Sequence, residues 1–407
     1  MRLRTAQSSE RHARPAAPRR PASRTRKAVA LSGLTATVFA LGACGADDKS
    51  ESHSDRAPIT DPLAVTYDGG VYLLDGNTLQ VASEVKLDGY NRVNPAGDDH
   101  HVVVSTADGF RILDAVHAEL TDIEFPGPKP GHVVRHANHT VLFTDGTGEV
   151  RIFDPSQLEG GTPKVDTYRA AAPHHGVAIE LANGNLVLTL GTEEKRTGMV
   201  VLDKNRTEIA RSEDCPGVHG EATAQGEAVV IGCQNGVLVY RDGKITKVAS
   251  PTPYGRIGNQ SGTDTSPVVL GDYKQDPDAE LERPHQVSLI DTRTDTLRLV
   301  DLGTSYTFRS FARGPKGEAL ILGTDGRIHV LDPESGTVTR TIPVLPAWEE
   351  PLKWQSPRPN LFVRGDDTYV SDPATKTIRR IDLTTGEITA TATLSATPNE
   401  LSGTSAH

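Results

Sequence analysis

Histidine recurs at one place in three successive segments of this chain. The segments KPGHVV, APHHGVAIE and CPGVHGEA place His132, the pair His174 and His175, and His219 just before or within a strand-like run. Imidazole is the commonest protein ligand of zinc, and three or four converging imidazoles make a tight site. Successive residues of a strand point to opposite sides, so one of His174 and His175 should face inward and the other away.

Two acids lie near these histidines in the sequence, and their role stays open. Asp145 and Glu221 could ligate a metal or orient an imidazole, whereas acids at turns are more often simply solvated. Equivalent histidines in a repeat can also be inherited without a function. A metal site therefore depends on whether the fold brings the three segments together.

The elements that carry these histidines repeat along the chain. An apolar run that ends in aspartate occurs eight times, at spacings of 39 to 50 residues, and most runs are followed by a turn. The terminal residues are Asp75, Asp114, Asp154, Asp203, Asp242, Asp291, Asp332 and Asp382. Periods in the forties, with about four short strands each, are typical of propeller blades. We predict an all-β protein that is a single β-propeller of eight blades, with seven as the alternative.

The two ends of the expected propeller complement each other. The first unit starts at LAVTY without an innermost strand before it, and the last unit is followed by the spare segment PNELSGTSAH. We expect this C-terminal segment to join the N-terminal blade and close the ring, which removes an open sheet edge. Innermost strands of a propeller run in one direction, so His132, His219 and one of His174 and His175 should meet at one mouth of the central channel.

Cys215 and Cys233 flank the pair of strands that starts at His219. Antiparallel neighbours would place these two positions side by side, so the cysteines can form one disulfide. A Cys–Cys half of a zinc site is a rival interpretation, although the spacing is not that of a zinc knuckle. Two free thiols are a third interpretation, which does not suit an exported protein.

The start of the chain has the composition of a processing segment. Nine basic residues precede an apolar stretch that ends in the letters LGAC, the last of which is Cys44. This pattern fits a lipoprotein signal in which Cys44 carries the lipid, with an ordinary signal peptide or a short membrane anchor as alternatives. The apolar run is shorter than the roughly 20 residues of a membrane helix. We expect a signal at 1–43, a flexible tether at 44–61 and the propeller at 62–407, held at the outer face of the cytoplasmic membrane.

Charge and motifs exclude several classes of function. The whole chain has a net charge of −10, and the part after residue 43 holds 34 basic and 52 acidic residues, which makes −18. A surface this acidic disfavours nucleic acid and attracts cations. The chain has no nucleophile elbow, helical zinc-protease pair or P-loop, so we expect a protein that carries a metal and is not an enzyme.

A second group of histidines falls toward the opposite end of the expected channel. Its members are His100, His101, His136, His139 and His407. A second, weaker metal site there is one interpretation, and dispersed solvated side chains are the other. The histidines that stand alone in the repeat pattern are His117, His285 and His329.

At these residues the sequence resembles the AztD family of extracytoplasmic zinc metallochaperones. The matching stretches are KPGHVVRHANHTVLFTDGTGEVRIFD, AAPHHGVAIE, CPGVHGEAT and SPRPNLFVRGDDTYVSDPATKTIRRID. The resemblance implies a β-propeller that binds Zn²⁺ and hands it to the substrate-binding protein of a zinc ABC importer. It also implies the ligands His132, His174 or His175, and His219. The family's insertion rich in histidine and aspartate is reduced here to DAVHAEL, which keeps only His117.

Three functions from different classes follow from these observations. The first is a monomeric, lipid-anchored zinc metallochaperone that carries the ion to a transporter subunit. The second is a propeller hydrolase or lactonase that uses a metal in its channel. The third is a propeller that binds protein or cell wall without any metal.

Overall fold

The computed structural model describes residues 57–405, and all structural statements concern this part of the chain. Its regular elements are strands apart from two short 3-10 helices, η2 (Pro155–Gly160) and η3 (Gln225–Glu227). No helix within these residues is long and apolar enough to cross a membrane. The predicted signal, Cys44, most of the tether and His407 lie outside the described residues.

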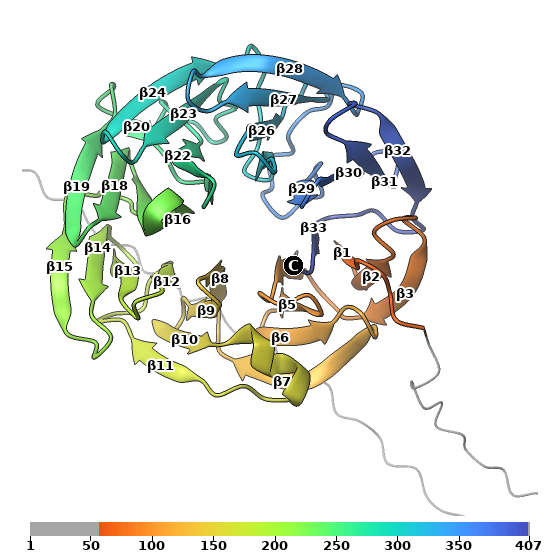
Figure 1. Ribbon diagram of the computed structural model, residues 1–407, viewed down its shortest axis with the longest axis horizontal. Coiled ribbons are helices and arrows are strands. Elements are labelled where there is room, and N and C mark those ends of the chain that lie inside the picture. Colours follow the sequence, from red (N-terminus) through yellow and green to blue (C-terminus); the bar gives the residue numbers. More distant parts are fainter. Residues whose placement is uncertain (1–56, 406–407) are drawn as a thin grey trace, which may run out of the picture. The chain divides into compact units, whose positions relative to one another are not determined.

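The 33 strands of the described part form eight sheets that are arranged as the blades of a ring around a central channel (Figure 1). Each blade has four antiparallel strands, and its innermost strand lines the channel. From the innermost strand outward, blades 1 to 4 consist of β33 (Leu401–Gly403), β1 (Leu63–Tyr67), β2 (Gly70–Leu74) and β3 (Val81–Lys86); β4 (Arg92–Pro95), β5 (His101–Ser105), β6 (Gly109–Asp114) and β7 (Glu119–Pro126); β8 (Pro130–His136), β9 (His139–Thr144), β10 (Glu149–Phe153) and β11 (Asp166–Arg169); and β12 (Ala178–Glu180), β13 (Leu186–Gly191), β14 (Arg196–Leu202) and β15 (Glu208–Ser212).

The other half of the ring follows the same plan, except that blade 5 has an additional short strand, β20 (Gly255–Arg256), beside its third strand. In the same order, blades 5 to 8 consist of β16 (His219–Ala224), β17 (Ala228–Cys233), β18 (Asn235–Arg241) and β19 (Lys244–Ala249); β21 (Gln260–Thr263), β22 (Ser266–Gly271), β23 (Gln286–Asp291) and β24 (Thr296–Asp301); β25 (Phe311–Arg313), β26 (Ala319–Leu322), β27 (Arg327–Asp332) and β28 (Thr337–Pro343); and β29 (Leu361–Arg364), β30 (Asp367–Asp372), β31 (Thr377–Asp382) and β32 (Ile388–Thr393).

Burial explains why the middle strands of each blade are the most apolar. Every residue of β1, β2 and β5 is buried, because both faces of these strands pack against neighbouring blades. The outermost strands β3 and β32 alternate between exposed and partly buried residues, as expected for a strand with one face in water. The prediction of an all-β propeller is confirmed, with eight blades and not seven.

The C-terminal strand closes the ring as the sequence predicts. β33 pairs with β1 in antiparallel register, with Leu401 opposite Val65 and Gly403 opposite Leu63. Blade 1 is thus built from the first and last strands of the described chain, which lie side by side in Figure 1. This pairing satisfies the edge of β1 that would otherwise be open.

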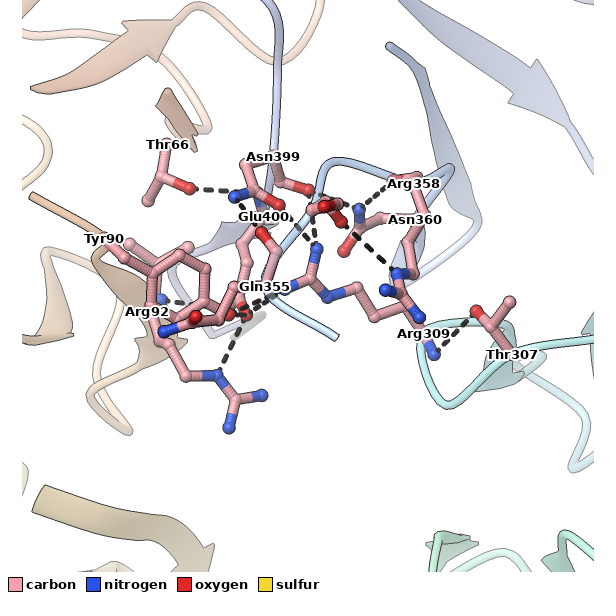
Figure 2. A network of polar contacts seen from close by, with 12 residues as sticks. Thr66, Tyr90, Arg92, Thr307, Arg309, Gln355, Arg358, Asn360, Asn399 and Glu400 are labelled. Atoms are coloured by element: carbon pink, nitrogen blue, oxygen red, sulfur yellow. Dashed lines mark hydrogen bonds and ion pairs between the residues drawn. The ribbon is translucent and has the colours of Figure 1, made fainter. Parts of the chain in front are cut away.

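A buried network of charged side chains holds the closing strand in place (Figure 2). Glu400, directly before β33, accepts hydrogen bonds from Arg309 at 2.6 Å, from Arg92 at 2.9 Å and from the hydroxyl of Tyr90 at 3.0 Å. Arg309 also donates to the side-chain oxygen of Asn399 at 2.7 Å. The side chains of Glu400 and Arg309 are only 7% and 5% exposed. Burial opposes ionisation of Glu400, but Arg92 and Arg309 outweigh it and lower the pKa of this carboxyl.

Candidate metal centre

The fold places the three histidine segments at one mouth of the channel. β8, β12 and β16 are the innermost strands of consecutive blades and run in the same direction, so their starts lie together. His132 is the third residue of β8, His219 is the first residue of β16, and His175 lies three residues before β12. The pairing of β16 with β17 shifts register between His219 and Glu221. Gly220 sits in this bulge with φ 72°, a conformation that suits glycine, and such bulges re-aim neighbouring side chains.

The imidazoles of His132, His175 and His219 form a compact triad. The centroids of the rings are 5.3 Å apart for His132 and His175, 5.7 Å for His132 and His219, and 4.9 Å for His175 and His219. One ligand nitrogen from each ring lies within 4.8 Å of the other two. Tetrahedral zinc with Zn–N bonds of about 2.0–2.1 Å needs nitrogens about 3.4 Å apart. Small rotations of the side chains therefore suffice to bring all three nitrogens onto one ion.

Hydrogen bonds to the outer nitrogens turn two of the rings toward each other. Nδ1 of His175 donates to Oδ2 of Asp145 at 2.5 Å, and Nδ1 of His219 donates to the carbonyl oxygen of Gly258 at 2.5 Å. These contacts leave Nε2 of each ring free to bind a metal, and the two Nε2 atoms face each other at 3.0 Å. Two bare nitrogens repel at this distance, so a proton or a metal cation between them is required. The donor set therefore fits a cation that prefers imidazole.

The surroundings keep two of the imidazoles neutral, which is the form that binds metals. Burial lowers the pKa of His132 to about 3, and the charges of His175 and two arginines act in the same direction. Burial and the neighbouring imidazoles lower the pKa of His219 well below its ordinary value. Glu221 lies beside the triad, with Oε2 at 3.7 Å from Nδ1 of His132, and burial raises its pKa to about 8. Neither histidine needs to lose a proton before it can bind a metal near neutral pH.

His174 and His175 have different roles, which the sequence left open. His174 is buried, donates from Nδ1 to the carbonyl oxygen of Ala172 at 2.9 Å, and accepts from the hydroxyl of Thr189 at 3.0 Å. Its ring packs against the edge of Phe143 at 5.2 Å. His175 joins the triad with its side chain 45% exposed. His174 shapes the loop before β12, while its neighbour points into the mouth.

The predicted disulfide between Cys215 and Cys233 is confirmed. The two Cα atoms are 4.9 Å apart, and both residues are fully buried. The bond joins the segment that leads into β16 to the end of β17, which restrains the loop presenting His219.

The second group of histidines separates into several local contacts. His101 is buried and donates to Asp98 at 2.6 Å, and His136 donates to Glu227 at 2.7 Å. His139 faces Glu180 at 3.8 Å. His100 instead lies beside His117, and their ring centroids are 6.0 Å apart. His117 is one of the histidines that stand alone in the repeat pattern.

His100, His117 and Asp114 form a second cluster with the spacing of a metal site. One ligand atom from each residue lies within 4.8 Å of the others, and His117 donates to Asp114 at 2.8 Å. The cluster lies on the β4–β5 and β6–β7 turns, at the end of the blade opposite the triad. The pairing of β5 with β6 sets His101 opposite Asp114, so the register of these strands was the signal that could have found this group.

The fold and the site define this protein as an eight-bladed propeller with three imidazoles from neighbouring blades converging at one mouth of its channel. No family model matches this chain. The chain is 24% identical over 296 residues to the zinc chaperone AztD of Citrobacter koseri, and the match covers 70% of this chain and 68% of that protein. The resemblance to AztD that the sequence motifs indicate is thereby confirmed.

Solved structures show the same fold. The crystal structure of Citrobacter koseri AztD matches with a TM-score of 0.72 and 21% identity, and the match covers 84% of this chain and 96% of that chain. The dihydro-heme d1 dehydrogenase NirN in complex with DHE matches with a TM-score of 0.57 and 13% identity, over 85% of this chain and 75% of that chain. At this level of identity the likeness concerns the fold alone.

Proposed function

We propose that this protein is an extracytoplasmic zinc metallochaperone that holds Zn²⁺ at His132, His175 and His219. The observation that carries this proposal is the convergence of three imidazoles from three blades, with ligand atoms within 4.8 Å of one another. The similarity to a protein named as a zinc chaperone supports it independently. The carrier then delivers the ion to the substrate-binding protein of a zinc ABC importer.

The geometry of the triad suits a carrier that must both hold and release its ion. Asp145 and the carbonyl of Gly258 fix the orientation of two imidazoles, which lowers the cost of assembling the site. His175 is more exposed than His132 and gives a partner protein access to the metal from solvent. Exchange can therefore begin at His175 while His132 and His219 still hold the ion.

We also propose that His100, Asp114 and His117 bind a second ion more weakly. The side chain of His117 is 51% exposed, so water screens the charges and competes with the metal there. This group replaces the set His100, His101, His136, His139 and His407 as the candidate second site, because three of those histidines have separate partners or are buried and His407 lies outside the described residues.

The N-terminal motif supports a lipid anchor at Cys44, which we propose keeps a monomeric protein at the outer face of the cytoplasmic membrane. The main chain of Ile59 donates to the carbonyl oxygen of Val116 at 2.8 Å. The described chain therefore begins at the end of the propeller that carries His100 and His117, opposite the triad. A tether attached there leaves the triad mouth free for a partner.

The proposal is tested by competition titration of the full-length protein with a zinc chelator. The triple variant with His132, His175 and His219 changed to alanine should lose zinc affinity by at least about a thousandfold, because removal of three ligands leaves no site. His285→Ala, an exposed histidine outside both groups, is the matched control.

The same preparations separate the alternative functions. Zinc transfer to the purified substrate-binding protein supports the carrier, and zinc-dependent turnover of esters or lactones supports a hydrolase instead. Tight binding that survives in the triple variant contradicts the assignment of the ligands.

A further inference from the structure

Three arginines surround the triad at the same mouth of the channel. Arg92 begins β4, Arg196 begins β14 and Arg256 ends β20, and each of these positions lies at the end of its blade where the innermost strand starts. The charges of Arg92 and Arg196 reach His132, and the charge of Arg256 reaches His219. Three positively charged groups therefore lie at the mouth where the triad would hold a divalent cation.

These three guanidinium groups have donors to spare. Arg92 uses only Nε to bind Glu400, is 44% exposed, and directs its terminal nitrogens away from Glu400 in Figure 2. Nη1 of Arg196 is buried without a hydrogen-bond partner among the described residues. The guanidinium of Arg256 packs closely against Gly258. It lies so close that a Cβ atom added at Gly258 would be only 2.4 Å from Nη1 of Arg256. Gly258 is the residue whose carbonyl orients His219.

By comparison, Arg309 and Arg358 engage most of their donors within the chain, although Nε of Arg309 is buried without a hydrogen-bond partner among the described residues. Arg309 binds Glu400, Asn399 and Tyr90, and Arg358 binds Glu350 at 2.6 Å and the carbonyl oxygen of Lys353 at 2.7 Å. Buried donors in a folded protein are normally satisfied, and the unsatisfied ones point to a missing partner. Unpartnered arginine nitrogens occur elsewhere in the described chain as well, but Arg92 and Arg196 keep theirs at the mouth that carries the triad.

A zinc ion bound at the triad would have one open coordination position, which an anion held by these arginines could fill. Three imidazoles leave one position of a tetrahedral zinc open, and the ion brings two positive charges next to three guanidinium groups. Asp145 is already engaged by His175 at 2.5 Å and by the main-chain nitrogen of Gly176 at 3.3 Å. A carboxylate from outside the chain offers one oxygen to the metal and the other to a guanidinium, and both contacts are favourable.

We propose that Arg92, Arg196 and Arg256 form a carboxylate-binding site that places an external carboxylate as the fourth ligand of the metal at the triad. The inference rests on the proposed function, because it needs a metal at His132, His175 and His219. The carboxylate belongs either to a small free anion or to an acidic side chain of another protein, and the chemistry of recognition is the same.

The test uses the full-length protein loaded with Co²⁺, whose visible spectrum reports its ligands. Acetate is titrated as the free anion, and acetyl-Gly-Asp-Gly-amide as the side-chain carboxylate. Either probe should change the spectrum in a saturable way, and the probe that binds more tightly identifies the source. Arg196→Gln with Arg256→Gln should weaken the response to the probe at least about tenfold and, because two positive charges are removed, should not lower the affinity for Co²⁺ without the probe. Arg256→Lys in place of Arg256→Gln keeps the charge and should restore part of the response that the double variant loses. Arg293→Gln changes an exposed arginine on the outer part of a blade and is the control.

Each other outcome decides against the inference. A protein that binds Co²⁺ normally but shows no spectral change with either probe overturns the carboxylate site and leaves the proposed function standing. The carboxylate site is also overturned if the arginine variants respond like the wild type, or if Glu221→Gln alone alters the spectrum without any probe, because Glu221 would then be the fourth ligand. Loss of Co²⁺ binding in the wild type would overturn the proposed function together with this inference.

Discussion

The two halves of the channel mouth use the same position of the repeat for different purposes. In blades 3 to 5 the residues near the start of the innermost strand are histidines that face one another. In blades 7, 8 and 1 the corresponding residues, among them Arg309, Asn360 and Asn399, are bonded to one another and to Glu400. The first half offers lone pairs to something outside the chain, whereas the second satisfies its charges from within. Positions of the repeat such as His175 and His219 are therefore available to a ligand because their neighbours satisfy one ring nitrogen and leave the other free.

The largest expected effect separates stability from metal binding. Glu400→Gln removes the carboxylate that Arg92 and Arg309 share and leaves two buried or half-buried cations without their counter-charge. We expect the free energy of unfolding to fall by about 3–5 kcal/mol, measured by urea denaturation, with zinc affinity little changed. Glu387→Gln on an exposed turn is the control. A stable variant with weakened zinc binding would show that the two halves are not separable.

The next effect acts on the histidine half alone. Asp145→Asn keeps the shape of the side chain but removes the charged acceptor that orients His175. We expect zinc affinity to drop about 10- to 100-fold, the usual result of losing a residue that orients a ligand, with the midpoint of urea unfolding nearly unchanged. Asp108→Asn, an exposed aspartate in a different turn, should bind zinc like the wild type. Unaltered affinity in Asp145→Asn would mean that His175 is held by packing.

The zinc affinity of the triad should depend less on pH than the zinc affinity of three histidines with ordinary pKa values. Because the pKa of His132 is about 3 and that of His219 is also lowered, zinc displaces no proton from either ring between about pH 5.5 and 7. The logarithm of the zinc dissociation constant should change by no more than about one per pH unit. A slope near two or three, from competition titrations across this range, contradicts neutral His132 and His219.

The same shifts make the metal-free protein sensitive to acid. The unfolded chain takes up protons on these histidines below about pH 6.5, while the folded state does not. The stability contributed by His132 is therefore full above the unfolded value and is lost as the pH falls toward about 3. Denaturation of the wild type and of His132→Phe at several pH values should show a shallower loss in the variant.

The smallest effect concerns the second cluster. His117→Ala should remove one weakly held zinc ion and leave the affinity of the triad unchanged, because the two groups lie at opposite ends of the blades. Equilibrium dialysis at rising zinc concentration measures this as a fall in stoichiometry from two ions to one. His329→Ala, whose ring is paired with Asp325 at 3.1 Å, should retain both ions. A stoichiometry of one in the wild type would contradict the second site.

Sequence patterns predicted the repeat well because a buried strand can be recognised from the apolar residues of that strand alone. The eight runs ending in aspartate and the spare C-terminal segment were enough to predict eight blades and the pairing of β33 with β1. His132 and His219 could be placed at one mouth because both belong to innermost strands. The choice between His174 and His175 could not be made, because both precede β12 and the alternation of a strand does not apply to them.

The sequence patterns did not predict contacts between loops that are distant in the sequence. Asp145 was as easily a solvated turn acid as a partner of His175, and nothing in the sequence marked Gly258 as the acceptor for His219. His117 joins His100 only through the register of β5 and β6. Each of these contacts depends on how neighbouring turns meet, which a pattern within one strand does not encode.

The proposed zinc site is tested most directly by anomalous X-ray diffraction at the zinc edge, from crystals of the zinc-loaded, full-length protein. We expect one strong peak within about 2.0–2.1 Å of a nitrogen from each of His132, His175 and His219. A strong peak elsewhere, with these three imidazoles contacting no metal, would contradict the proposed site.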